Sequence, residues 1–247
     1  MDSKKFVFIC GLHRSGTTIL FKLLREQDQI SGFSGTGVPR DEGQHLQSVY
    51  PSAKKVGGTG NFAFNKKARL DETSELITPE NKEQLLSEWG KHWDLSKDIL
   101  LEKSPPNIIR TRFLQEMFPE SYFIIIKRHP VAVSFATDSF SKKTFELERL
   151  LEHWVECHRQ AEQDIPYLKN VMTIKYEDLV ADPEKFMGDI SELVRFNADD
   201  ITLNVKSNTN DKYFKQWREL PQDVRKSLEE KFEEQINKYG YSFKDVQ

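Results

Sequence analysis

The chain has 247 residues and a formal net charge of −3, which results from 36 basic and 39 acidic residues. This length allows one large domain with a substantial buried core. The near balance of charges argues against a protein that coats nucleic acid and against a polybasic membrane anchor.

The N-terminal segment and the cysteines indicate where the protein works. Met1–Lys5 leads into only five apolar residues, Phe6–Cys10, which is too short for a signal peptide or a membrane span. Cys10 and Cys157 both fall in apolar segments. We therefore expect buried free thiols, a cytoplasmic location and no contact with a membrane.

Hydrophobic patterns predict alternating strands and helices along the chain. Apolar runs predict buried strands over residues 6–10, 122–126 and 171–174. Helical patterns follow the first strand and recur over residues 80–94, 145–163 and 222–238, and Pro105-Pro106 and Asp182-Pro183 suit the first turns of two further helices. The alternation favours an α/β fold, a single domain over residues 1–247 with a central parallel sheet flanked by helices.

Residues 31–78 interrupt this alternation. The stretch is irregular and contains many glycines. So long a segment without periodicity inside a compact domain is usually functional, so we expect a loop or lid on the substrate side of the site.

The turn Gly11–Thr18 is the most informative motif of the chain. It joins the first strand to a helix whose apolar face includes Leu20 and Leu24, so backbone N–H groups and the positive helix end face one point. The glycine spacing is that of a P-loop, but Thr17 stands where an NTP-binding loop has its lysine, and Arg14 supplies a cation instead. We expect a P-loop-like phosphate site; the alternative is a glycine-rich turn without a ligand.

Two later segments extend the motif. One runs from Glu102-Lys103-Ser104-Pro105-Pro106-Asn107 through the strand at 122–126 to Lys127-Arg128-His129-Pro130, and the other is Ile174-Lys175-Tyr176-Glu177-Asp178-Leu179. Together with the first loop, they resemble the sulfotransferases that use PAPS, 3′-phosphoadenosine 5′-phosphosulfate. The similarity is greatest to the branch with Arg-Ser-Gly-Thr-Thr in the loop, which includes bacterial and protein-tyrosine sulfotransferases.

The resemblance implies a set of cofactor contacts. The 5′-phosphosulfate would be held by the loop, and the 3′-phosphate by Arg128 and Ser134, although Ser134 comes two residues earlier than in the commoner family spacing. Tyr176 would reach the adenosine. Lys212 would lie at the 3′-phosphate or the adenine rim, in a segment that departs from the Arg-Lys-Gly of the cytosolic branch. The loop residues concerned are Arg14, Ser15, Gly16, Thr17 and Thr18.

The catalytic groups are also predicted from the resemblance and from chemistry. The acceptor must lose a proton as it attacks, and a carboxylate or an imidazole can take it. Glu42 is the first candidate for this base and His45 is its rival. Lys103 would steady the sulfuryl group and the leaving oxygen, and Arg14 would add charge within the loop.

These residues favour a PAPS-dependent sulfotransferase with a small-molecule acceptor bearing a hydroxyl or amine. No metal is expected, because cations can surround the group and the six histidines show no metal-ligand spacing. The alternatives are a protein-tyrosine sulfotransferase, a nucleotide or small-molecule kinase, and a non-catalytic nucleotide-binding protein. No nucleic-acid partner is expected, and the oligomeric state is left open.

Overall fold

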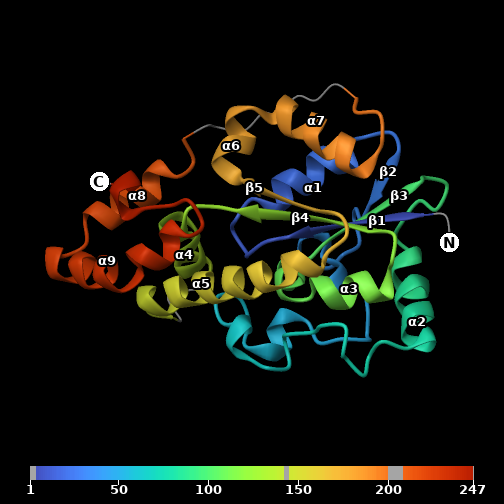
Figure 1. Ribbon diagram of the computed structural model, residues 1–247, viewed down its shortest axis with the longest axis horizontal. Coiled ribbons are helices and arrows are strands. Elements are labelled where there is room, and N and C mark those ends of the chain that lie inside the picture. The colour runs from blue at the N-terminus through green and yellow to red at the C-terminus, as the bar shows by residue number, and fades with distance from the viewer. Residues whose placement is uncertain (1–3, 142–144, 200–207, 247) are drawn as a thin grey trace.

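A five-stranded parallel sheet forms the centre of the described part of the chain, with the strand order β2-β3-β1-β4-β5 (Figure 1). The structure is a computed structural model and describes residues 4–141, 145–199 and 208–246. The strands are β1 (Lys5–Cys10), β2 (Ile30–Gly32), β3 (Ile99–Lys103), β4 (Ser121–Lys127) and β5 (Val171–Lys175).

Helices cover both faces of the sheet. Figure 1 shows α1, α6 and α7 on one face and α3 and α5 on the other, while α4, α8 and α9 gather at the end toward which β4 points. The helices are α1 (Thr17–Arg25), α2 (Pro79–Gly90), α3 (Thr111–Met117), α4 (Pro130–Phe140), α5 (Leu147–Asp164), α6 (Tyr176–Ala181), α7 (Pro183–Val194), α8 (Asp211–Arg218) and α9 (Gln222–Asn237). The α/β fold with a central parallel sheet flanked by helices is thus confirmed.

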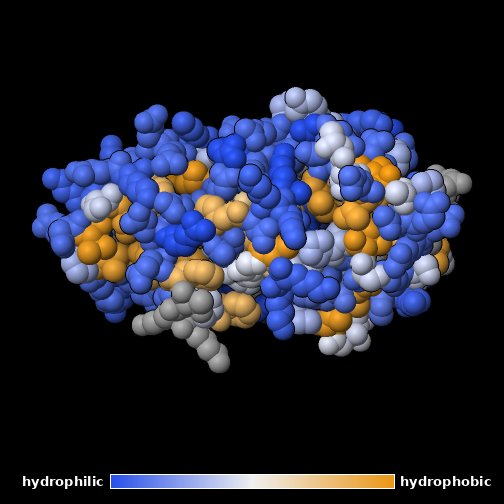
Figure 2. Space-filling view, turned by 90° about the horizontal axis from the view of Figure 1, so that it is seen from below, coloured by the Kyte–Doolittle hydropathy of each residue, from blue (hydrophilic) through white to orange (hydrophobic). Residues whose placement is uncertain are grey.

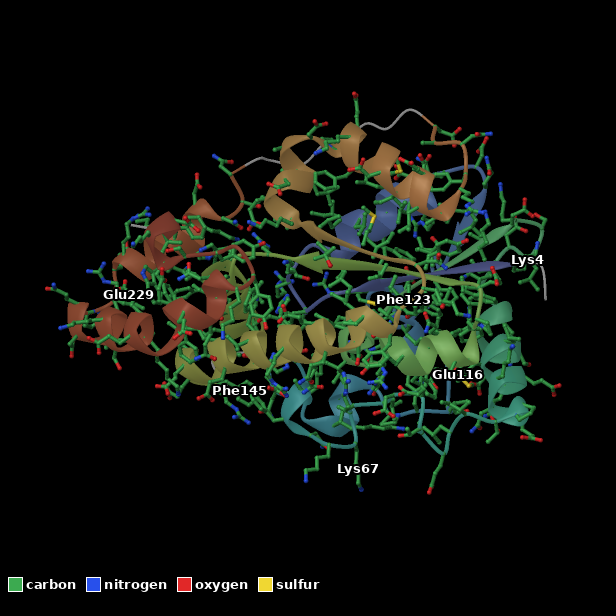
Figure 3. All side chains as sticks on the ribbon, in the orientation of Figure 1. Lys4, Lys67, Glu116, Phe123, Phe145 and Glu229 are labelled. Atoms are coloured by element: carbon green, nitrogen blue, oxygen red, sulfur yellow. The ribbon has the colours of Figure 1, made fainter. Side chains whose placement is uncertain are left out.

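The central strands are apolar because both of their faces are covered. Residues 6–10 of β1 and 121–126 of β4 are buried, and Phe8 stacks on Phe123 with 5.7 Å between the ring centroids. Figure 3 places Phe123 in the middle of the molecule, whereas Lys67 and Glu229 lie at its periphery. Side-chain packing on both sides of β1 and β4 therefore forms the core.

Two local predictions differ from the structure, and two strands were not predicted. The strand expected to be buried at 171–174 is an edge strand in which only Ile174 is buried, because β4 is its single neighbour. Pro105-Pro106 begins a 3-10 helix, Pro105–Ile109, before α3 starts at Thr111. The apolar runs did not predict β2, which has three residues, or β3, whose last two residues are the buried charged pair Glu102 and Lys103.

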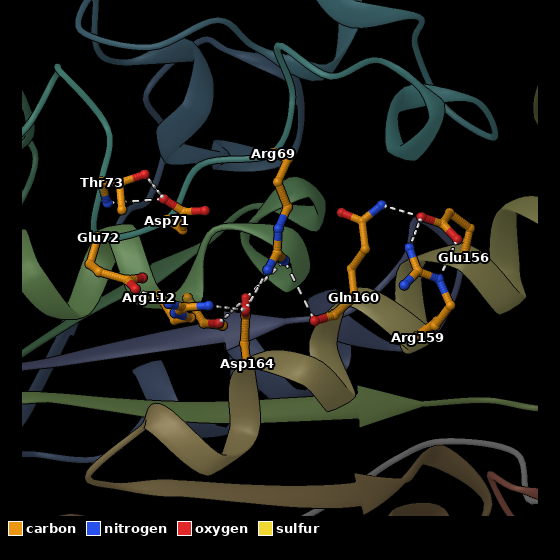
Figure 4. Close-up of polar contacts among 10 residues, drawn as sticks. Arg69, Asp71, Glu72, Thr73, Arg112, Glu156, Arg159, Gln160 and Asp164 are labelled. Carbon is orange, nitrogen blue, oxygen red and sulfur yellow. Dashed lines mark hydrogen bonds and ion pairs between the residues drawn. The ribbon is translucent and has the colours of Figure 1, made fainter.

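The irregular segment 31–78 packs against the scaffold over much of its length. It contributes Phe33, Tyr50 and Phe62 to the core. Near its end, Arg69 forms a two-pronged ion pair with the buried Asp164 of α5, at 2.5 and 3.0 Å, and Arg112 lies between Asp164 and Glu72 (Figure 4).

The part of this segment that stands most clear of the scaffold is short. Ser34, Gly35, Gly37, Pro39 and Arg40 are exposed, and neither glycine has another atom within 4 Å of the position of a Cβ.

The face that Figure 2 shows is mostly hydrophilic, with separate hydrophobic areas among the polar side chains.

Candidate active site

The turn after β1 is shaped to hold an anion at the start of α1. Arg14 and Gly16 both adopt left-handed backbone conformations, with φ of 70° and 100°. The backbone N–H and the hydroxyl of Ser15 both donate to the carbonyl of Leu12, at 3.1 and 2.7 Å, which closes the turn. The next N–H groups, at the beginning of α1, have no partner within the helix and are available to a ligand.

Glycine is required at position 16 for two reasons. Its positive φ is a conformation that side chains rarely adopt, and a Cβ there would collide with the ring of Tyr176. Tyr176 thereby supports the loop from behind, and its hydroxyl lies 2.8 Å from the hydroxyl of Thr209.

A pocket of about 270 Å³ opens beside this turn. Its lining comes from the loop, from the segment before α2, and from the residues around α4. The lining residues are His13, Arg14, Gly16, Thr17, Thr18, Ile19, Arg40, Glu42, Pro105, Arg128 and Phe140. Six of the predicted site residues are therefore brought together here: Arg14, Gly16, Thr17, Thr18, Glu42 and Arg128.

Arg128 links the loop to the C-terminal part of the chain. It follows β4 and is only 7% exposed. Its Nη1 donates to the carbonyl of Arg14 at 2.9 Å, and its Nε donates to Oδ1 of Asn210 at 2.8 Å. The guanidinium also lies over the ring of Tyr176, with 4.4 Å between its carbon and the ring centroid. The side chain is thus held from several sides at the edge of the pocket.

Glu42 and Lys103 form a buried ion pair beneath the pocket. Lys103 Nζ lies 3.0 Å from Oε1 of Glu42 and also donates to the carbonyl of Arg40 at 3.2 Å. Gln44 Nε2 donates to the other oxygen of Glu42 at 2.6 Å. The carboxylate is therefore fixed in orientation while it still lines the pocket.

A second carboxyl group, that of Glu102, supports the backbone beside Glu42. Its Oε1 accepts from Gly43 N at 2.9 Å and from Ser104 Oγ at 2.5 Å, and Asn107 Nδ2 donates to Oε2. Burial raises the pKa of Glu102 to about 7. A Cβ at position 43 would collide with this carboxyl group, so the close approach requires glycine there.

The two histidines near Glu42 differ in position. His45 Nε2 lies 3.8 Å from Oε2 of Glu42, and burial lowers the pKa of His45, which is not among the residues that line the pocket. His13 lines the pocket, and burial lowers its pKa to about 4, so its imidazole is neutral at pH 7. Its Nδ1 is buried without a partner among the described residues.

Four other predicted residues lie outside the pocket lining. The polar groups of Ser15 are turned toward Leu12, and Tyr176 lies behind the loop. Ser134 is buried on α4 and lines a much smaller cavity with His13 and His153. Lys212 is exposed on α8, with its Nζ 4.6 Å from the centroid of the Tyr213 ring.

Several residues of the site were not identified from the sequence. Arg40 and Phe140 line the pocket, with the guanidinium carbons of Arg14 and Arg40 at 5.6 and 5.9 Å from the Phe140 ring centroid. Gln44 donates to the carboxylate of Glu42, and Asn210 accepts from the guanidinium of Arg128. An isolated arginine, glutamine or asparagine in an irregular segment carries no periodic signal, so only the three-dimensional packing reveals these roles.

Comparison with known proteins identifies the family of the chain. A sequence profile of the sulfotransferase family matches residues 7–200. The chain belongs to the sulfotransferase family. This sulfotransferase is 24% identical over 213 residues to protein-tyrosine sulfotransferase A of Caenorhabditis elegans, in an alignment that covers 81% of the chain and 52% of that protein. The chain thus spans about half the length of this curated relative.

Solved structures share the fold at low sequence identity. The sulfotransferase domain of the Synechococcus PCC 7002 olefin synthase superposes with a TM-score of 0.56 at 17% identity, covering 98% of both chains. Sulfotransferase STF1 of Mycobacterium tuberculosis gives 0.54 at 15% identity, covering 80% of this chain and 69% of the other. At such identities the likeness supports the fold.

None of the helices in the described ranges is both long and apolar enough to cross a membrane. Within the same residues, no group of three or more His, Cys, Asp or Glu side chains is placed to hold a metal ion. Cys10 and Cys157 are buried free thiols, as expected.

Proposed function

We propose that the protein transfers a sulfuryl group from PAPS to a hydroxyl or amine of a small-molecule acceptor. The observation that carries the proposal is the composition of the pocket. One pocket combines the start of α1, the guanidinium groups of Arg14 and Arg128, and the carboxylate of Glu42. Two arginines and a helix N-terminus suit a doubly phosphorylated nucleotide, and a carboxylate suits the removal of a proton.

The residues fit PAPS without a metal ion. The unpaired N–H groups at the start of α1 and the guanidinium of Arg14 would hold the 5′-phosphosulfate. Arg128 would bind the 3′-phosphate, with Lys212 and Ser134 as further candidates, and Tyr176 would carry the adenosine side of the site. Charge stabilisation by such fixed donors is the main contribution expected in a transfer between two oxygens.

Glu42 would act as the base. As the acceptor oxygen or nitrogen forms its bond to sulfur, its proton passes to Glu42, and the bond between sulfur and the 5′-phosphate oxygen breaks to release PAP. Protonation of Glu42 weakens its ion pair with Lys103, whose ammonium can then hydrogen-bond the leaving oxygen. His45, whose Nε2 lies 3.8 Å from Oε2 of Glu42, remains the alternative base.

The acceptor class must be decided by competition. Glu42 lines the pocket and can take a proton from a small alcohol or amine and from a tyrosine side chain alike. The curated relative named as a protein-tyrosine sulfotransferase makes a tyrosine-containing peptide the necessary competitor in any test.

The test is transfer of labelled sulfate from PAPS in the presence of EDTA. Acceptors would be a panel of small alcohols, phenols and amines, and a tyrosine-containing peptide in parallel. We expect labelled small-molecule products and little labelled peptide. Labelling of the peptide alone would contradict the small-molecule acceptor, and phosphoryl transfer that depends on MgATP would contradict the whole proposal.

A further inference from the structure

Glu177, in the first turn of α6, is the meeting point of three segments that are far apart in the sequence. Its Oε1 accepts from the backbone N–H of His129 at 2.9 Å and from Nδ2 of Asn210 at 2.8 Å. Its Oε2 accepts from the hydroxyl of Tyr241 at 3.0 Å. A carboxylate has acceptor capacity for all of these bonds, and both oxygens of Glu177 are engaged.

Asn210 carries this arrangement to Arg128. Its Oδ1 accepts from Arg128 Nε at 2.8 Å while its Nδ2 donates to Glu177. Because a guanidinium only donates and a carboxylate only accepts, this is the single amide orientation that satisfies both neighbours. Asn210 is 8% exposed and Arg128 is 7% exposed, so the bond between them is shielded from water, whereas Glu177 is half-buried.

Arg128 keeps donors for a ligand in this arrangement. A guanidinium has five N–H groups, of which the Nε–H and one on Nη1 are used at short distances. The contacts from Nη2 to Thr209 are long, at 3.4 Å. The Nε end is held by Asn210 and the face by Tyr176, and among the described residues Nη2 makes no bond shorter than 3.4 Å. Arg128, which lines the pocket, therefore keeps donor capacity for a ligand.

We propose that Glu177 is a positioning residue for the 3′-phosphate, which acts through Asn210 to fix the plane of the Arg128 guanidinium. The inference rests on the proposed use of PAPS. A bidentate bond from arginine to phosphate depends on the orientation of the guanidinium plane, so a group that fixes this plane contributes to affinity without touching the ligand.

The test compares two nucleotides in variants of Glu177. PAP and AMP share the adenosine and the 5′-phosphate, and only PAP carries the 3′-phosphate. For Glu177→Ala, we expect PAP affinity measured by calorimetry to fall about tenfold or more, the scale of losses caused by outer residues that orient a ligand-binding group. AMP affinity should stay within about twofold, since Arg128 makes no bond to it.

Further variants separate positioning from general support of the fold. Glu177→Gln should restore most of the PAP affinity, because its amide oxygen can accept the same two bonds from His129 and Asn210. Tyr241→Phe removes one bond to Glu177 but leaves the link to Arg128, so it serves as the matched control and should bind PAP like the wild type. Asn210→Ala should behave like Glu177→Ala, and the double variant should be no worse than Asn210→Ala alone.

The outcomes are distinguishable from failure of the proposed function. If the wild type does not prefer PAP over AMP, the use of PAPS itself is contradicted. If the wild type prefers PAP and Glu177→Ala retains that preference, or loses PAP and AMP affinity equally, the positioning role is contradicted. Should Glu177→Ala not fold, Asn210→Ala carries the same comparison.

Discussion

At the scale of single residues, the pair formed by Glu42 and Lys103 serves two purposes at once. Lys103 is fully buried and Glu42 is 4% exposed, so each charge depends on the other for stabilisation. Removing one partner of such a pair typically costs about 3–5 kcal/mol because the other charge is left buried and alone. Any variant at these positions must therefore be examined for stability as well as for activity.

Replacing Glu42 tests the assignment of the base. Glu42→Gln should lower turnover by roughly a hundredfold or more, the usual scale for loss of a general base, while PAP affinity changes by less than about tenfold. His45→Ala should have a smaller effect, because His45 lies outside the pocket lining. Single-turnover kinetics at a temperature where both variants are folded makes the comparison. The reverse order of effects would assign the base to His45.

Variants of Lys103 allow its contribution to catalysis to be measured apart from its contribution to stability. Lys103→Met should lower the free energy of unfolding by about 3–5 kcal/mol, since Glu42 is left as an unpaired buried charge. Adding Glu42→Gln should recover much of that loss, because the buried charge is then gone. Turnover should stay low in the double variant. Recovery of activity together with stability would show that the ion pair is only structural.

At the scale of elements, the loop before α1 depends on one backbone position. Gly16→Ala combines an unfavourable positive φ with a collision against Tyr176, so PAP binding should be lost and the melting temperature should fall. Gly35→Ala is the matched control, since its φ is also positive but open space surrounds it. Gly35→Ala should lower the free energy of unfolding by only about 1 kcal/mol, the cost of a positive φ at a residue with a side chain. If both variants changed the melting temperature and PAP binding equally, the contact with Tyr176 would not be the reason that glycine is needed at position 16.

The irregular segment 31–78 should respond to ligand only in part. Its core residues and the Arg69–Asp164 ion pair tie it to the scaffold, whereas residues 34–41 are more open and lead into Glu42. Hydrogen exchange with and without PAP should show slower exchange in peptides that cover 34–42 and little change over 50–68. Uniform protection of the whole of 31–78 would support a lid that moves as one unit.

The sequence predicts the secondary-structure elements better than it predicts the contacts that build the candidate active site. Local sequence patterns were enough to predict β1, β4 and the turn between Gly11 and Gly16, because these features depend on residues that are close together in the chain. β3 was missed because Glu102 and Lys103 end it, and buried charges are unexpected without knowledge of their partners. The pairing of Asn210 with Arg128 joins residues 82 positions apart, and no local pattern encodes such a contact.

At the scale of the whole molecule, buried neutral histidines make stability depend on pH. Burial lowers the pKa of His13 to about 4 and those of His153 and His158 to about 3. A lowered pKa in the folded state gives stability that is present above the unfolded value of about 6.5 and is lost as the pH falls toward the folded values. At about 1.4 kcal/mol per pKa unit, this corresponds to roughly 3 kcal/mol for His13 and roughly 5 kcal/mol for each of His153 and His158.

We therefore expect the free energy of unfolding, measured by denaturant titration, to fall steeply between pH 6.5 and pH 4.5. His158 is not among the residues that line the pocket. His158→Phe should reduce the slope of the free energy of unfolding against pH by the equivalent of about one proton, because it removes one titrating group while keeping an aromatic ring beside Trp154. Glu102 acts in the opposite direction, since its pKa is raised to about 7, and its contribution is lost as the pH rises through 7. A free energy of unfolding that does not change between pH 6.5 and 4.5 would contradict the burial of these histidines.

The most direct test of the central claim is a calorimetric titration of the wild type and of Arg128→Ala with PAP in the presence of EDTA. We expect PAP to bind the wild type without magnesium and at least about tenfold more tightly than AMP, because an arginine–phosphate bond is charge-assisted. Arg128→Ala should lose most of that difference. PAP binding that requires magnesium, or that is unchanged in Arg128→Ala, would contradict a PAPS site in this pocket.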